Sequence, residues 1–88
     1  MAYTYILKCS DNTYYTGWTK DLDNRLYAHN SGQASKYTRV RLPVSIIYYE
    51  YFESDNDAMK REAAIKKLTR KGKEELIKLN KNYEEEHV

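Results

Sequence analysis

The alternation of hydrophobic and polar residues predicts three strands in the first two thirds of the chain. Residues 2–9 and 13–18 are rich in β-branched and aromatic side chains, and turn-forming residues 10–12 (Ser-Asp-Asn) join them as a hairpin. Residues 44–52 predict the third strand. Because apolar side chains occupy both odd-numbered and even-numbered positions of this segment, we expect this strand to be central in the sheet and covered on both faces.

Three other segments place apolar side chains at helical spacing. The predicted helices cover about residues 20–29, 55–69 and 73–83, with a break at Gly72 between the last two and a basic loop over residues 33–42. The side chains expected to face the core are Leu22, Leu26, His29, Ala58, Ile65, Leu68, Leu76, Leu79 and Tyr83. The order of these elements predicts an α+β fold in which helices cover a small sheet.

Length and cysteine content narrow the class of protein. A chain of 88 residues is long enough for one domain, which we place at residues 2–78, followed at 79–88 by the end of the last helix and an acidic tail. The single cysteine, Cys9, cannot form a disulfide framework, and no cysteine–histidine cluster has zinc-binding spacing. The first residues do not resemble a signal peptide, and no apolar run could span a membrane. We therefore expect a cytoplasmic protein.

The net charge is only +2, but the charges are unevenly distributed. Between residues 24 and 49 there are four basic residues and no acidic one, and between residues 60 and 73 there are seven basic residues and one acidic residue, Glu62. Two local concentrations of positive charge suit contact with a polyanion, because cations placed along phosphates release counterions. The same pattern is typical of solvated helix faces, so charge alone leaves both interpretations open.

Five residues form a set that could cleave a phosphodiester. Tyr5 and Tyr15 are both at odd-numbered positions of the predicted hairpin and could face the same side of it. Arg25 and His29 are i, i+4 neighbours on one face of the predicted first helix. A phenol can act as a base or a nucleophile, and an arginine binds phosphate bidentately and stabilises developing charge. Glu62 is a carboxylate that could recruit a divalent cation.

Each member of this set also has an ordinary structural interpretation. Strand tyrosines usually pack against cross-strand neighbours, and a histidine on an apolar stripe is more often half-buried and hydrogen-bonded. Arg25 could pair with Asp21, and Glu62 could pair with Lys66, because the members of each pair are four residues apart on a predicted helix. Spacing alone therefore does not decide between catalysis and packing.

The spaced motifs resemble those of the GIY-YIG nuclease superfamily. Residues 3–5 (Tyr-Thr-Tyr) stand where its first motif falls, and residues 15–17 (Tyr-Thr-Gly) where its second motif falls. Arg25 followed by His29 resembles the arginine and histidine or tyrosine of its first helix, and the helix around Glu62 resembles the one that carries its metal-binding glutamate. The resemblance covers about residues 3–78 and is greatest to small stand-alone members of UPF type and to the nuclease domain of structure-selective repair endonucleases.

The resemblance implies a fold, an activity and a role for each of these residues. The fold would be a central three-stranded antiparallel sheet flanked by helices, and the activity Mg²⁺- or Mn²⁺-dependent cleavage of DNA with one bound ion. Tyr5 would be the general base or nucleophile, Tyr15 would position the water or the phosphate, and Arg25 would stabilise the transition state. His29 would contact the phosphate or relay a proton, and Glu62 would hold the metal.

The expected DNA-binding surface contains basic residues and one tyrosine: Lys20, Lys36, Tyr37, Arg39 and Arg41. A domain of this length leaves little room for reading a sequence, so we expect recognition of branched, flapped or single-stranded DNA, in repair or recombination. One alternative is a nucleic-acid-binding module that does not cut, because aromatic platforms and cations suffice for binding single strands. Another is an adaptor that docks a protein partner on the third strand or the last helix.

Overall fold

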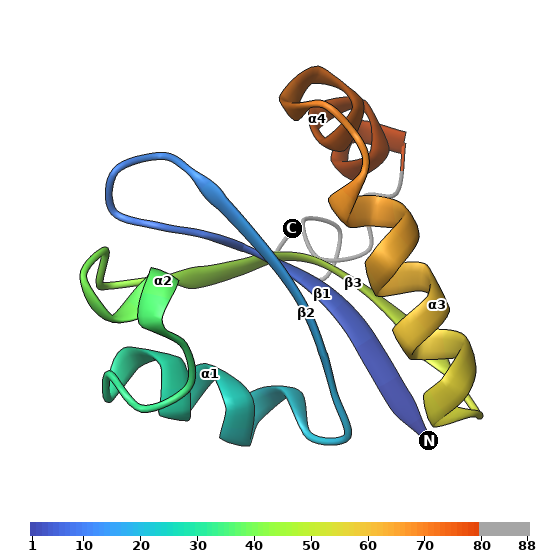
Figure 1. Cartoon of the computed structure of the whole chain (residues 1–88), viewed down its shortest axis with the longest axis horizontal. Helices are drawn as coiled ribbons and strands as arrows, with labels where there is room; N and C mark the ends of the chain where they lie inside the picture. Colours follow the sequence, from blue (N-terminus) through green and yellow to red (C-terminus); the bar gives the residue numbers. More distant parts are fainter. Residues whose placement is uncertain (80–88) are drawn as a thin grey trace, which may run out of the picture.

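A computed structural model describes residues 1–79 of the chain, which form a three-stranded sheet and four helices (Figure 1). The elements in chain order are β1 (Ala2–Lys8), β2 (Tyr14–Thr19), α1 (Leu22–Asn30), α2 (Lys36–Arg39), β3 (Ser45–Phe52), α3 (Asp55–Lys66) and α4 (Arg70–Leu79). No helix among these residues is long and apolar enough to cross a membrane. The α+β class and the antiparallel sheet predicted from the sequence are confirmed.

The strand order is β2-β1-β3, so the prediction that the third strand is central was wrong. A bulge explains why its sequence suggested burial on both faces. Tyr48 pairs with Ile6 and Ile46 with Leu7, which leaves Ile47 as an extra residue in β3. Ile46 and Tyr48 therefore point to opposite faces of the sheet although they share a parity, and they join different hydrophobic clusters. The true central strand is β1, which pairs along both edges.

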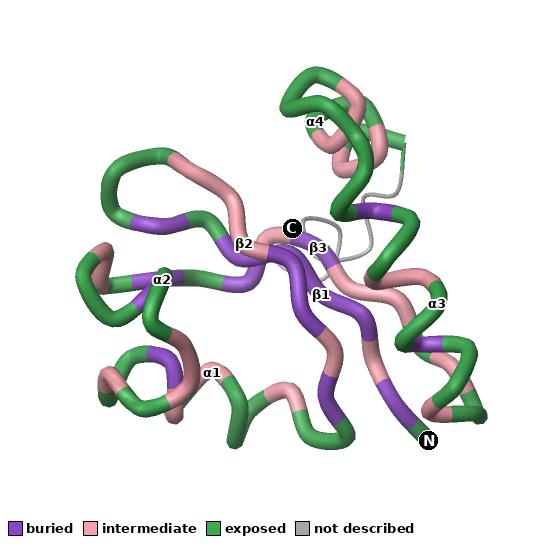
Figure 2. Tube along the Cα trace, in the orientation of Figure 1, coloured by how far each residue is buried: buried purple, intermediate pink, exposed green. Residues whose placement is uncertain are grey.

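Helices cover the two faces of the sheet in pairs, α1 and α2 on one face and α3 and α4 on the other (Figure 1). Leu22 and Leu26 of α1 pack on a cluster that includes Leu7 and Ile46. Ile65 of α3, together with side chains of α4, packs on Ile6 and Tyr48 of the opposite face. Most of the buried residues in Figure 2 therefore lie along the strands.

Polar contacts hold α3 against the sheet and thereby fix the orientation of Glu62. Thr4 of the central strand donates a hydrogen bond of 2.7 Å to the carbonyl oxygen of Ala58. Glu50 of β3 accepts hydrogen bonds from the guanidinium of Arg61 at 3.0 and 3.1 Å. Because these contacts come from β1 and β3, α3 is tied to two of the three strands.

The expected basic loop contains a short helix, α2, that sequence periodicity did not predict. The Ser35 side chain accepts a hydrogen bond from the backbone N–H of Thr38 and caps this single turn. The turn buries Thr38 completely, with 0% exposure. A four-residue helix is too short to show a hydrophobic period, which is why the segment was predicted as a loop.

The last helix begins earlier than predicted. Gly72 lies inside the first turn of α4, where its backbone N–H donates a hydrogen bond to the Thr69 hydroxyl. The interruption between α3 and α4 therefore lies at residues 67–69 and not at the glycine. The prediction that Leu68 and Leu79 are core residues was wrong, because they are 40% and 87% exposed. Ile77 of α4 packs on the sheet instead. Among the predicted core positions, Tyr83 lies outside the described residues, as does almost all of the predicted tail.

Candidate active site

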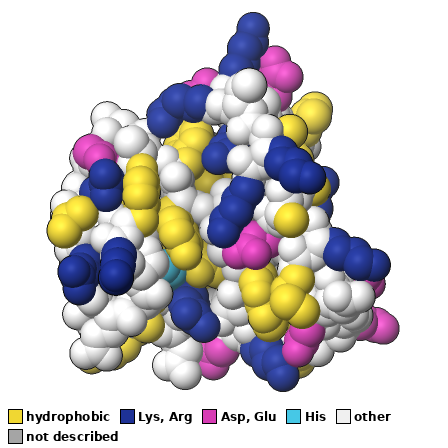
Figure 3. Space-filling view, viewed as in Figure 1, with side chains coloured by type: hydrophobic (Ala, Val, Ile, Leu, Met, Phe, Trp, Pro, Cys, Tyr) yellow, Lys and Arg dark blue, Asp and Glu magenta, His cyan; other side chains and the backbone are white. Residues whose placement is uncertain are grey.

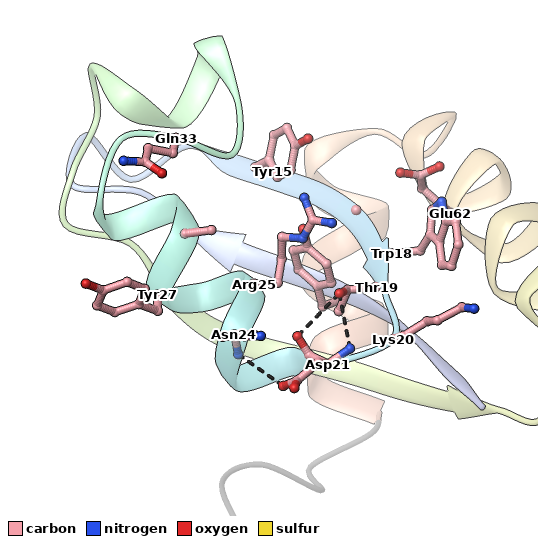
Figure 4. Close-up of a pocket in the computed structure, with 13 residues that line it drawn as sticks. Tyr15, Trp18, Thr19, Lys20, Asp21, Asn24, Arg25, Tyr27, Gln33 and Glu62 are labelled. Atoms are coloured by element: carbon pink, nitrogen blue, oxygen red, sulfur yellow. Dashed lines mark hydrogen bonds between the residues drawn. The ribbon is translucent and has the colours of Figure 1, made fainter.

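A cavity of about 810 Å³ lies along β2, between α1 and α3 (Figure 4). Four of the five residues predicted to be catalytic line it: Tyr5 from β1, Tyr15 from β2, Arg25 from α1 and Glu62 from α3. These residues come from elements distributed over most of the chain, and the fold brings them to one place. The hollow is open at the surface between the two halves of the molecule (Figure 3).

Tyr5 forms the floor of the cavity, and Gly17 makes room for it. The two residues face each other in the β1–β2 pairing. A Cβ atom at position 17 would lie 2.5 Å from the Tyr5 hydroxyl oxygen, closer than any real contact. The glycine of the second motif therefore allows the tyrosine of the first motif to lie across β2, which leaves the Tyr5 side chain only 3% exposed.

The Tyr5 hydroxyl is hydrogen-bonded to Nε2 of His29 at 2.9 Å. His29 is 1% exposed and lies behind Tyr5, and it is not a lining residue of the cavity. Its Nδ1 is 2.8 Å from the hydroxyl oxygen of Thr38 in α2. Of the two roles expected for His29, this buried position suits a proton relay through Tyr5 better than a direct contact with phosphate.

The neighbours of Thr38 indicate which ring nitrogen of His29 carries the proton. The Thr38 hydroxyl has acceptors on Ser35 at 3.3 and 3.5 Å, to which it can donate. It then accepts from Nδ1–H of His29, and Nε2 is free to accept the Tyr5 O–H. Thr38 was not predicted as a site residue, because a threonine in a basic loop gives no signal until the fold places it against the histidine.

Burial keeps the Tyr5–His29 pair uncharged. Desolvation raises the pKa of Tyr5, and the nearby charges of Tyr15 and Glu62 raise it further, while Arg25 opposes them. Desolvation and the positive charge of Arg25 lower the pKa of His29 to about 4. At neutral pH the pair therefore consists of a phenol and a neutral imidazole.

Arg25 and Tyr15 form the side of the cavity nearer α1 and α2. Arg25 is exposed, and its guanidinium end is directed towards Tyr15 (Figure 4). The Tyr15 ring packs edge-on against His29, with ring centroids 5.2 Å apart, and stacks on Tyr37 at 6.1 Å. Asp21, the suggested partner of Arg25, instead caps α1 by accepting a hydrogen bond from the backbone of Asn24. The cavity therefore presents a guanidinium and a phenol together.

Glu62 reaches the cavity although α3 covers the opposite face of the sheet. β2 is an edge strand, so the Glu62 side chain passes around it beside Trp18 (Figure 4). The predicted ion pair with Lys66 is present, at 3.5 Å, and the Glu62 side chain is 22% exposed. The ion pair with Lys66 therefore does not keep the Glu62 carboxylate out of the cavity.

The donor set of the cavity fits a hydrated magnesium or manganese ion. Glu62 and Asp21 are the carboxylates that line it, and Asp21 caps a helix. The described residues contain no group of three or more side chains that could hold a metal by themselves. Mg²⁺ typically keeps several waters and binds through one or two carboxylates plus substrate phosphates, so Glu62 could serve as its protein ligand.

Of the predicted DNA-binding residues, only Lys20 lines the cavity. Lys20 lines the cavity and pairs with Asp55 of α3 at 3.1 Å. Lys36 and Arg39 line a separate small hollow at the start of α2. The remaining two, Tyr37 and Arg41, form a cation–aromatic pair with 3.9 Å between guanidinium carbon and ring centre, and Arg41 is also bonded to Asp11.

Comparison with known proteins agrees with the geometry. Residues 1–76 match the family described as the GIY-YIG catalytic domain. A UPF0213 protein of Clostridium perfringens is 51% identical over 98% of this chain and 97% of its own length, and one of Streptococcus agalactiae is 52% identical over 92% of each. The solution NMR structure of a UPF0213 protein from Bacillus halodurans shares 43% identity with a TM-score of 0.60, covering 91% of this chain and 86% of that one. The chain therefore belongs to the GIY-YIG family of nuclease type, and within it to the UPF0213 proteins.

Proposed function

We propose that this protein is an endonuclease that hydrolyses DNA phosphodiester bonds with a divalent metal ion and little sequence specificity, in DNA repair or recombination. The observation that carries the proposal is the arrangement of the cavity. Tyr5, Tyr15, Arg25 and Glu62 line one hollow, and the Tyr5 hydroxyl is hydrogen-bonded to His29. A base, a cation for the phosphate and a carboxylate for a metal are the groups that this reaction requires.

In this mechanism Tyr5 takes a proton from the attacking water as its own proton moves to Nε2 of His29. The 2.9 Å hydrogen bond provides the path for the second transfer. In the free protein the raised pKa of Tyr5 and the lowered pKa of His29 both oppose the charge separation, so the proton stays on Tyr5. A bound phosphate brings negative charge that favours imidazolium, so substrate binding would activate the pair.

The other residues would act on the phosphate. Arg25 is exposed at the cavity wall, where its fork of N–H groups could bind two phosphate oxygens and stabilise the charge that develops on them. Tyr15 would orient the water or the phosphate through its hydroxyl. A magnesium or manganese ion held by Glu62 would supply positive charge beside the phosphate and the leaving oxygen. The exposed side chain of Lys66, at 52%, could move away from Glu62 as the ion binds.

Cleavage of supercoiled plasmid and of flapped and branched DNA tests the proposal. We expect nicking in Mg²⁺ or Mn²⁺, a loss of about 100-fold or more in Glu62→Gln and in Tyr5→Phe, and wild-type rates in the control Glu75→Gln. Glu75 is an exposed carboxylate on α4 and does not line the cavity. Equal cleavage by the wild type and by Glu62→Gln would show that the activity comes from a contaminant and would exclude the endonuclease.

A second candidate is a module of the same fold that binds nucleic acid without cutting it. Two observations favour it. The raised pKa of Tyr5 keeps its hydroxyl protonated, which disfavours its action as a base, and Lys66 already neutralises Glu62. Salt-dependent binding to DNA, with no cleavage in either metal on any of the three substrates, would select this candidate.

A further inference from the structure

A second hollow, of about 260 Å³, lies along β2 next to the candidate active site. We call it the edge groove, and its lining residues are Tyr14, Tyr15, Thr16, Tyr37, Lys66 and Lys73. Tyr15 also lines the cavity of the candidate active site, so the two hollows adjoin at this residue of β2. β2 pairs only with β1 among the described strands, which leaves its outer side to these two hollows.

Two lysine side chains line the edge groove, and aromatic rings flank it. Its lining contains two lysines and no carboxylate, although the carboxylate of Glu62 is 3.5 Å from Lys66. Arg70 lies over the Tyr14 ring at 4.2 Å, donates to a backbone oxygen of the β1–β2 turn and pairs with Glu74 at 3.2 Å, which leaves Lys73 as the lining cation without a carboxylate partner among the described residues. With Arg41 over Tyr37 on the other side, a cation–aromatic pair borders the groove on each side.

Thr16 gives an independent indication that a ligand belongs there. It is only 3% exposed, and its hydroxyl oxygen has no hydrogen-bond partner among the described residues. A buried hydroxyl without a partner destabilises a fold, so such a group calls for an explanation. A ligand that entered the edge groove and displaced the flexible side chains of Lys66 and Lys73 could provide the missing partner.

We propose that the edge groove binds an unpaired DNA strand where it continues beyond the phosphate held in the cavity. The two lysines of the lining suit phosphates, and tyrosine and arginine surfaces stack with bases, which are available only in a strand without a complement. From Tyr14 to Gly17 the two hollows extend over roughly 10 Å of strand β2, so one DNA strand can pass through both. The proposal rests on the proposed function and narrows its substrate to flaps and single strands.

Binding measured in a chelator, where no cleavage occurs, separates this proposal from the endonuclease. Fluorescence anisotropy would compare a labelled oligothymidine, a flapped duplex and a blunt duplex of equal length. We expect the two substrates with unpaired strands to bind about tenfold more tightly than the blunt duplex. Lys73→Ala should weaken their binding about fivefold and lower the salt slope by about one. Lys71→Ala is the matched control, since Lys71 is exposed on the same helix and does not line the groove.

Thr16→Val distinguishes a ligand contact from a structural role. The substitution keeps the shape and removes the unpartnered hydroxyl, so we expect an equal or higher melting temperature together with weaker binding of the single strand. Binding of the blunt duplex as tight as that of the flap would overturn the proposal. Equal effects of Lys73→Ala and Lys71→Ala would also overturn it, and would leave the β2 edge to another occupant such as a protein strand. Neither result bears on whether Glu62 supports cleavage.

Discussion

The Tyr5 side chain lies across the backbone of Gly17, and the space it occupies is the space a side chain at position 17 would need. A Cβ there would be 2.5 Å from the Tyr5 hydroxyl oxygen and 2.7 Å from the adjacent ring carbon. The two residues belong to different motifs and are opposite each other in the β1–β2 register. The glycine thus determines where the hydroxyl of the candidate base lies.

Gly17→Ala should displace Tyr5 and damage the site. The added methyl group meets a buried ring, so we expect a loss of about 1–3 kcal/mol in the free energy of unfolding. A shift of the hydroxyl by about 1 Å should lower cleavage about 100-fold. Urea unfolding and flap cleavage measure the two effects.

Gly72→Ala is the matched control for this substitution. A Cβ at position 72 would meet its nearest atoms, on Leu68 and Thr69, at 3.4 Å, which is an ordinary contact. Because alanine is a better helix former by up to about 1 kcal/mol, the variant should be as stable as the wild type or more stable. Equal losses in the two alanine variants would contradict the role assigned to Gly17.

Arg25→Lys should lower cleavage about tenfold to 100-fold while stability changes by less than about 0.5 kcal/mol. Lysine keeps the positive charge but cannot bind two phosphate oxygens with one planar group. Arg25 is exposed, so the core does not depend on it. Single-turnover cleavage and thermal melting check the two parts, and a lysine variant with wild-type activity would show that charge alone is required.

Stability should rise with pH between about 4 and 6.5 because of His29. In the unfolded chain the imidazole has its usual pKa of 6.5, and in the folded protein its pKa is about 4. The unfolded state therefore binds more protons within this window. The contribution of His29, at most about 3 kcal/mol, is fully present above pH 6.5 and is lost as the pH falls towards 4.

Urea unfolding across this pH range, for the wild type and for His29→Gln, isolates that contribution. Glutamine keeps a polar group beside Tyr5 and does not titrate, so the difference in stability between the two proteins should shrink as the pH falls. Carboxylates elsewhere titrate in both proteins and cancel in the comparison. A constant difference from pH 4 to 6.5 would mean that His29 is not buried as a neutral ring.

Arg61→Met should destabilise the fold by about 1–3 kcal/mol. The Glu50 side chain is 19% exposed, is bonded to both Arg61 and the Tyr48 hydroxyl, and would lose its charged partner. The partial exposure of Arg61, 37% for its side chain, keeps the loss below that of a fully buried pair. A double-mutant cycle with Glu50→Gln measures the coupling, and simple additivity of the two substitutions would refute it.

Removing the metal should abolish cleavage and leave the fold intact. Glu62 is the proposed protein ligand, and the cores on the two faces of the sheet are built from apolar side chains without it. We expect a chelator to stop nicking while the melting temperature stays within about 1 °C of its value in Mg²⁺ without DNA. A large drop in melting temperature on chelation would indicate a structural metal instead.

Local patterns were sufficient for several elements of the fold. The hairpin, the first helix and the third strand were predicted within a few residues, because alternation, turn residues and capping residues act over short distances. The cavity residues Tyr5, Tyr15, Arg25 and Glu62 were likewise named from residue type, spacing and family resemblance. The surface residues were less predictable, since Arg41 is bonded to Asp11 and Tyr37 stacks on Tyr15.

Other features depend on partners that are distant in the sequence. The bulge at Ile47 places Ile46 and Tyr48 on opposite faces of the sheet. Thr38 became a partner of His29 only because α2 packs beside α1. Glu62 reaches the cavity because β2 is an edge strand that the side chain can pass around.

The sequence by itself thus determined the strands, most of the helices and the chemical identity of the candidate site, because backbone propensity and residue chemistry are local properties. Only the tertiary structure decided strand order, the partners of the two His29 ring nitrogens, the pKa shifts and the position of Tyr15 between the cavity and the edge groove. Those properties arise from burial and from contacts between segments, and neither exists until the chain has folded.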